Sequence, residues 1–161
     1  MSSEENILAY SIKQKEINYD AEDLLLIQAQ IFNRNSDGKV MVEKVSPDNS
    51  YYGGKYHIPG VAVRFGEHPE EAGHRVLTDE LEVSDRKINL INVQSHKAEN
   101  NRWYILFIFE SEPLSNEEMS NPCDGIDELL YLDLETANAD NSTNGLIDIR
   151  ESMKNPGKNY I

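Results

Sequence analysis

The segment from residue 57 to residue 83 constrains the fold most, because it contains a helix with a clear start. It reads HIPGVAVRFGEHPEEAGHRVLTDELEV. His68 occupies the position that caps a helix, and Pro69 suits the first turn, where its missing N–H needs no partner. Glu70 and Glu71 then place negative charge at the positive end of the helix dipole. This pattern predicts a helix that continues to about Leu81.

Runs of branched and aromatic residues flank this helix and predict β-strands. Within one of them, we expect Ile88 and Leu90 to share the burial, because apolar residues alternate there. The expected elements are strands at 24–32, 39–45, 88–96, 103–110 and 129–132, a loop at 46–56, and a second helix near 145–154. This order predicts an α/β fold in which helices pack on a mixed β-sheet.

The chain length and charge limit the domain organisation and the partners. At 161 residues, we expect one domain (1–161) with a core at about 24–154 and a polar N-terminal leader. The formal net charge of −14 repels nucleic acids and anionic membranes, so neither is an expected partner. An anionic nucleotide would need a local cation cluster or a bound divalent ion. The single cysteine, Cys123, and a start without a signal peptide pattern favour a cytoplasmic location.

Acidic residues gather on the central helix. At α-helical spacing, Val76, Asp79 and Glu80 share one face, because residues three and four apart are neighbours. Glu67 lies in the loop just before the helix, and Arg75 lies between the acids. Such a helix suits a hard divalent cation, which prefers oxygen ligands. A solvated helix held by ion pairs is the alternative that the spacing leaves open.

The order of these residues resembles the Nudix box over residues 61–83. The pattern is Gly, five residues, Glu, seven residues, then Arg-Glu-apolar-any-Glu-Glu-any-Gly-apolar. Residues 53–60 (GGKYHIPG) resemble the segment that precedes the box in that family, and the resemblance covers about residues 24–154. It implies a Nudix-like α/β/α sandwich with a mixed β-sheet. The positions that match are Glu67, Arg75, Leu77, Asp79 (for Glu), Glu80 and Val83.

Three positions depart from the box. Val61 stands at the first glycine, Val76 at the glutamate that follows the arginine, and Glu82 at the second glycine. Val76 offers no oxygen to a metal. Val61 would be strained if this position required positive φ, and Glu82 would cost about 1 kcal/mol if the left-handed conformation persists.

The resemblance implies a hydrolase of a nucleoside diphosphate derivative, such as a nucleotide sugar, that uses Mg²⁺ or Mn²⁺. Glu80 would be the main metal ligand, with Glu67 and Asp79 as further ligands. Arg75 would orient the carboxylates, and Arg64 would meet a phosphate oxygen. MutT-like members of the superfamily act on small nucleotide-type substrates, and a homodimer is expected by analogy.

The segment 75–81 also resembles GDP-mannose mannosyl hydrolases, which lack the same glutamate and use a histidine base. His96 is the candidate base here, with His57 as the alternative. Tyr56 and Trp103 could stack on a base or sugar, although packing at the rim of the core is an alternative role for them. The second function that the departures leave open is a catalytically inactive domain that binds a nucleotide or a protein partner.

Overall fold

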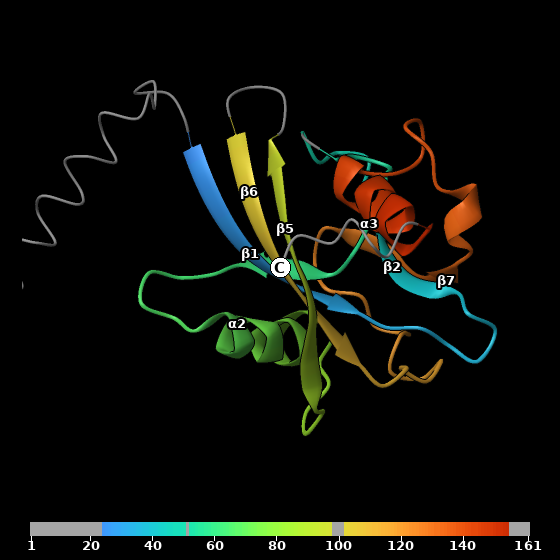
Figure 1. Cartoon of the computed structure of the whole chain (residues 1–161). Coiled ribbons are helices and arrows are strands. Elements are labelled where there is room, and N and C mark those ends of the chain that lie inside the picture. Colours follow the sequence, from blue (N-terminus) through green and yellow to red (C-terminus); the bar gives the residue numbers. More distant parts are fainter. Residues whose placement is uncertain (1–23, 51, 98–101, 155–161) are drawn as a thin grey trace, which may run out of the picture.

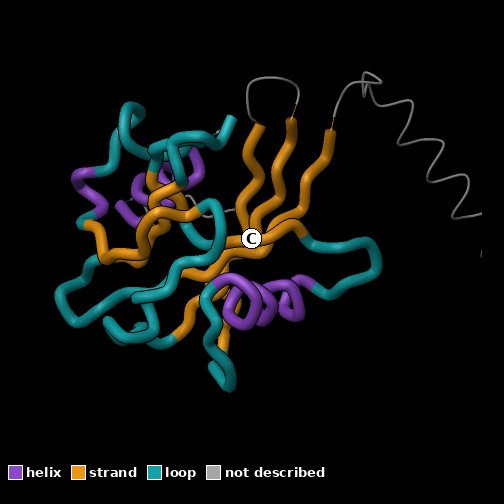
Figure 2. The backbone as a smooth tube through the Cα atoms, turned by 180° about the vertical axis from the view of Figure 1, so that it is seen from behind, coloured by secondary structure: helices purple, strands orange, loops and turns teal. Residues whose placement is uncertain are grey.

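Two β-sheets form the centre of the part that the structure describes, residues 24–50, 52–97 and 102–154 of the chain. In this computed structural model, two helical segments lie on opposite sides of the larger sheet (Figure 1). The same layers are seen from behind in Figure 2, with the strands between the helical segments. The predicted α/β/α sandwich is therefore confirmed. Within the described residues, no helix is long and apolar enough to cross a bilayer.

The larger sheet has four strands in the order β4-β1-β6-β5. The central pair, β1 (Leu24–Phe32) and β6 (Arg102–Ser111), runs parallel from Leu24↔Arg102 to Phe32↔Glu110. The outer strands β4 (Gly60–Ala62) and β5 (Ile88–Lys97) are antiparallel to their neighbours. The sheet is therefore mixed, as the sequence predicts.

The smaller sheet has three antiparallel strands in the order β3-β2-β7. They are β3 (Tyr56–His57), β2 (Val40–Val45) and β7 (Ile126–Leu132). The strands β2 and β7 confirm the predicted strands at 39–45 and 129–132. The sequence pattern missed β3 and β4, because strands of two and three residues are too short to show a period.

The helices pack on the two faces of the larger sheet. On one face, α2 (Pro69–Arg75) and the π-helical turn η1 (Val76–Glu80) cover one apolar cluster. On the other face, α3 (Asn144–Lys154), with the 3₁₀ turn η2 (Leu134–Thr136) nearby, covers a second cluster. Successive residues of β1 point to opposite faces, so Ile31 joins the first cluster and Phe32 the second.

The start of α2 confirms the predicted cap. The Nδ1 of His68 accepts a hydrogen bond from the Glu70 N–H at 3.3 Å. The Glu71 carboxylate accepts one from the His68 N–H at 3.0 Å, which closes a capping box. These bonds fix the point at which the chain turns from the loop into the helix.

The end of this helix differs from the expected regular α-helix. The Leu81 N–H donates to the Val76 carbonyl at 3.2 Å, a bond across five residues. The π turn has more residues per turn than an α-helix, so Asp79 no longer shares a face with Val76 and Glu80. Val76 is fully buried in the apolar cluster, Glu80 is partly buried, and Asp79 is exposed.

The expected burial of Leu90 is wrong. Ile88 is buried, but Leu90 is 52% exposed, and the register of β5 against β6 shifts between Leu90 and Asn92. An extra residue in one strand bends it locally and interrupts the alternation of inward and outward side chains. The simple period of two therefore does not hold across this bulge.

Glu82 adopts the left-handed conformation, with φ of 53°. We expect Glu82→Gly to stabilise the fold by about 1 kcal/mol, because glycine reaches this conformation without the clash of a Cβ atom. Urea denaturation at neutral pH would measure the change in the free energy of unfolding. Ser84→Gly is the control, since Ser84 is not among the described residues with positive φ. An equal effect of the two substitutions would contradict the strain at Glu82.

Candidate active site

Glu67 and Arg75 form a clamp between the loop and the helix. Arg75 Nε donates to Glu67 Oε1 at 2.9 Å, and Arg75 Nη2 donates to Glu67 Oε2 at 3.0 Å. The same Nη2 also donates to the Ala62 carbonyl of β4 at 2.8 Å. The Arg64 N–H donates to Glu67 Oε2 at 2.7 Å. Arg75 therefore ties α2 to β4 and to the loop between them.

These bonds keep Glu67 ionised. The hydrogen bonds from the Arg75 guanidinium, then from the Arg64 N–H, lower the pKa of Glu67 to about 2. Both carboxylate oxygens of Glu67 already have partners in the protein. Glu67 is thus a positioning residue in this structure, and any role as a metal ligand would require it to share its oxygens.

Glu80 lies at the end of the π turn with one oxygen unsatisfied. Its Oε2 is buried and has no hydrogen-bond partner. Burial, together with the charge of Glu43, raises the pKa of Glu80 to about 8, although a hydrogen bond from the Gly60 N–H and the charge of Arg75 oppose this shift. Glu80 is therefore a carboxyl group held in a site that disfavours its charge.

Glu43 is the candidate site residue that the sequence pattern did not predict. It lies on β2 two residues after Met41, so both side chains face the side covered by η1. Glu43 is buried, and its Oε1 has no partner. The other oxygen, Oε2, lies 3.8 Å from Nδ1 of His57. The sequence feature that points to it is an acid that directly follows three apolar residues in a strand, VMVEKV.

Cys123 lies in the loop before β7, close enough to the same two acids for their charges to act on its thiol. Burial, followed by the charges of Glu43 and Glu80, raises the pKa of the Cys123 thiol. The shift points to a neutral thiol beside the acids, not to a reactive thiolate. Cys123 thus borders the acidic pair as a small, weakly polar group.

The three expected metal ligands do not meet at one point. Asp79 is exposed and accepts a hydrogen bond from its neighbour Thr78 at 2.9 Å. In the part of the chain that the structure describes, no group of three or more His, Cys, Asp or Glu side chains is placed to hold a metal. The two acids that interact electrostatically are Glu80 and Glu43.

The first departure from the box pattern causes no strain. Val61 pairs with Ala29 in β4, and it is not among the described residues with positive φ. The position that requires glycine is the preceding residue, Gly60. A Cβ on Gly60 would lie 2.8 Å from Cγ of Gln30 and 2.9 Å from the Ala29 carbonyl oxygen. The backbone at Gly60 therefore fits close to β1 while its N–H reaches Glu80.

The remaining predicted residues are spread over the molecule. His96 is on β5, and its Nδ1 lies 2.8 Å from the Asp148 carboxylate of α3. Trp103 Nε1 donates to Ser95 Oγ at 2.7 Å, and Tyr56 packs against the α3-side cluster. Arg64 is exposed in the loop before α2. Of the two histidines, it is His57 that lies beside the acidic pair.

Comparison with known proteins gives a result for structure and none for sequence. No protein-family model and no curated protein matches the chain. A MutT protein from Methanosarcina mazei superposes with a TM-score of 0.69 over 86% of this chain and 99% of its own, at 16% identity. The chain has the Nudix fold. A MutT Nudix hydrolase from Burkholderia pseudomallei agrees, with a TM-score of 0.63 over 80% of this chain and 98% of its own, at 18% identity.

A third solved structure with the Nudix fold contains a ligand. It is the Nudix domain of NrtR from Shewanella oneidensis in complex with ADP ribose. It superposes with a TM-score of 0.59 over 88% of this chain and 96% of its own, at 17% identity. These superpositions confirm the Nudix fold that the resemblance to the Nudix box implies.

Proposed function

We propose that this protein hydrolyses a nucleoside diphosphate derivative with the help of a divalent cation. The observation that carries the proposal is the pair of acids Glu43 and Glu80, each with a buried oxygen that has no partner. Burying two carboxylates that repel each other is unfavourable unless a cation or a proton compensates their charge. A fold that retains such a pair therefore retains a place for positive charge.

The two acids fit Mg²⁺ or Mn²⁺. Magnesium is usually bound through one or two carboxylates, with water and substrate phosphates as the other ligands. Glu80 and Glu43 would hold the ion, and Glu67 and Asp79 would support it from further out. When bound, such an ion neutralises a diphosphate and stabilises the charge that develops on the leaving group. In the protein alone, one buried oxygen of each acid has no hydrogen-bond partner.

The basic residues of the box have separate roles in this proposal. Arg75 positions α2 and its acids through its bonds to Glu67 and to the Ala62 carbonyl. Arg64 lies on the exposed loop that follows β4, and in this proposal its side chain would pair with a phosphate of the substrate. A local cation is needed because the chain carries a net charge of −14, which repels an anionic substrate.

Aromatic rings beside the acidic pair support a substrate that contains a base. Tyr52 stacks on His57, with 5.8 Å between ring centroids and an interplanar angle of 25°. Tyr52 is 38% exposed, so part of its ring is open to a ligand. Tyr56 and Trp103 remain further candidates for stacking. The complex of the NrtR Nudix domain makes ADP ribose the first compound to test.

The experiment is a screen of ADP ribose and nucleotide sugars with Mg²⁺ and Mn²⁺, with products identified by mass. We expect turnover by the wild-type protein and none by Glu80→Gln or Glu43→Gln. Glu70→Gln is the matched control, because Glu70 is an exposed acid in the first turn of the same helix. Binding of these compounds without turnover would replace the proposal with the binding-only domain. Turnover that survives in both acid variants would also contradict it.

The position of the histidines leads to a separate prediction. We expect His57→Asn to lower kcat about 10²- to 10⁴-fold, the range for loss of a general base, because His57 lies beside Glu43. His96→Asn should leave kcat nearly unchanged, since His96 is paired with Asp148 of α3. Steady-state kinetics on the substrate found in the screen would measure both. A larger loss in His96→Asn would restore His96 as the base.

A further inference from the structure

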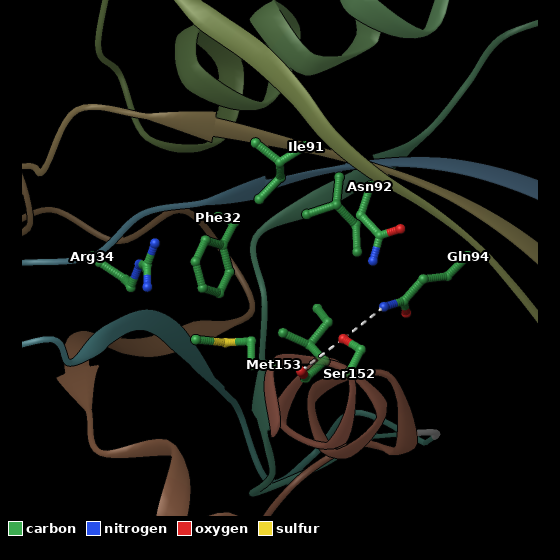
Figure 3. A pocket seen from close by; sticks show the side chains of 9 residues that line it. Phe32, Arg34, Ile91, Asn92, Gln94, Ser152 and Met153 are labelled. Carbon is green, nitrogen blue, oxygen red and sulfur yellow. Dashed lines mark hydrogen bonds between the residues drawn. The ribbon is translucent and has the colours of Figure 1, made fainter. Parts of the chain in front are cut away.

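A cavity of about 280 Å³ lies on the α3 side of the larger sheet (Figure 3). Its apolar wall includes Phe32 and Ile108 from the sheet and Ile149 and Met153 from α3. Three of these side chains, those of Phe32, Ile108 and Ile149, belong to the apolar cluster under α3. The helix α2 packs on the opposite face of the sheet, so this cavity is separate from the candidate active site.

Polar groups of three kinds border this apolar wall. Asn92 comes from the bulged part of β5, and its Oδ1 is buried without a partner. Gln94 Nε2 donates to Ser152 Oγ at 3.3 Å, a bond that links β5 to α3 across the cavity rim. Arg34 supplies a cation, and the lining contains no acid. In a chain with a net charge of −14, such a lining is a local exception.

The arrangement of Arg34 and Phe32 favours a flat ligand with negative charge. The guanidinium carbon of Arg34 lies 5.5 Å from the centre of the Phe32 ring, a geometry that holds the cation at the mouth of the cavity. Figure 3 shows the Phe32 ring between Arg34 and Ile91, directed toward the space above Met153. An aromatic ring placed there would contact the edge of Phe32 and the sulfur of Met153.

We propose that this cavity binds a small aromatic carboxylic acid that also carries a hydrogen-bond donor. The ring would occupy the apolar wall, the donor would satisfy Oδ1 of Asn92, and the carboxylate would pair with Arg34. The volume suits a ligand of about ten to fifteen non-hydrogen atoms. Arg34 already pairs with Glu110 at 3.5 Å, but its side chain is 47% exposed and has further N–H donors for a second carboxylate.

Indole-3-acetate is a suitable probe, because it combines a flat ring, one N–H and one carboxylate. Titration calorimetry, with two-dimensional NMR to map the site, should give saturable binding and shifts at residues 91–94 and 149–153. We expect naphthalene-1-acetate, which lacks the donor, and indole-3-acetamide, which lacks the charge, each to bind about tenfold more weakly.

Variants test the same contacts from the protein side. Arg34→Gln should weaken indole-3-acetate about tenfold and leave indole-3-acetamide unchanged. Met153→Trp should abolish binding by filling the cavity from the exposed side of α3, where Met153 is 43% exposed. Lys39→Gln, an exposed cation of the β1–β2 turn, is the control and should bind normally. Circular dichroism would verify that each variant is folded.

Two results would overturn the proposal. One is the absence of saturable binding of indole-3-acetate to the wild-type protein, in which case ordered water satisfies Asn92. The other is binding that Met153→Trp retains, or that Glu80→Gln removes, because the probe would then occupy the candidate active site. Failure of the hydrolase assay alone leaves this proposal unaffected.

Discussion

Glu80→Gln should stabilise the protein by on the order of 3 kcal/mol at pH 8 in the absence of divalent cations. The reason is the raised pKa of Glu80, about 8, which results first from burial and then from the charge of Glu43. Asp79 adds to the rise, whereas the Gly60 N–H and Arg75 oppose it. Glutamine keeps the shape of the neutral acid without the charge that this site disfavours.

The sign of this effect follows from linkage. The pKa of Glu80 is higher in the folded than in the unfolded protein, so the folded state binds the proton more tightly. The stability that results is fully present below about pH 4.5 and is lost as the pH rises through 8. The two proteins should therefore be equally stable at pH 4, and the difference should grow with pH and level off above pH 8.

Urea denaturation of both proteins between pH 4 and pH 9 measures this difference. Glu70→Gln is the control and should follow the wild-type curve, because it removes an equal charge from an exposed site. Adding millimolar Mg²⁺ should stabilise the wild type at pH 8 and have little effect on Glu80→Gln. A difference between the two that is the same at every pH would show that Glu80 is ionised normally in the folded protein.

The structure confirms the elements that local sequence patterns predict. The capping residues before α2 act within four positions of one another, and β1, β5 and β6 are long enough to show apolar runs. The very short strands β3 and β4 depend instead on pairing with distant strands, Glu43 with His57 and Ala29 with Val61. Local propensity carries no information about such pairing.

The candidate site was predictable only in part, for a similar reason. Arg75 and Glu67 follow from the box pattern, and their bond is present. Glu43 comes from another strand, so only the folded chain places it beside Glu80. The expected alignment of Asp79 assumed a regular α-helix, and the π turn that begins at Val76 removed it.

The π turn also determines the expected effect of placing a glutamate at position 76, as in the box pattern. Val76 stands where the box pattern has a glutamate, yet its side chain is fully buried among apolar neighbours such as Leu77 and Phe109. A carboxylate there would lose its hydration without a partner of opposite charge. Substitution toward the family pattern is therefore expected to damage the fold before it can improve a metal site.

Val76→Glu should lower the free energy of unfolding by about 3–5 kcal/mol at pH 7, the cost of an uncompensated charge in a core. Thr78→Glu, which adds the same charge at an exposed position of the same turn, should change it by less than about 0.5 kcal/mol. Urea denaturation measures both. The loss in Val76→Glu should shrink at low pH, where the new carboxyl is protonated. A stable Val76→Glu protein with increased Mg²⁺-dependent turnover would instead show that the π turn can rearrange to present this position to the metal.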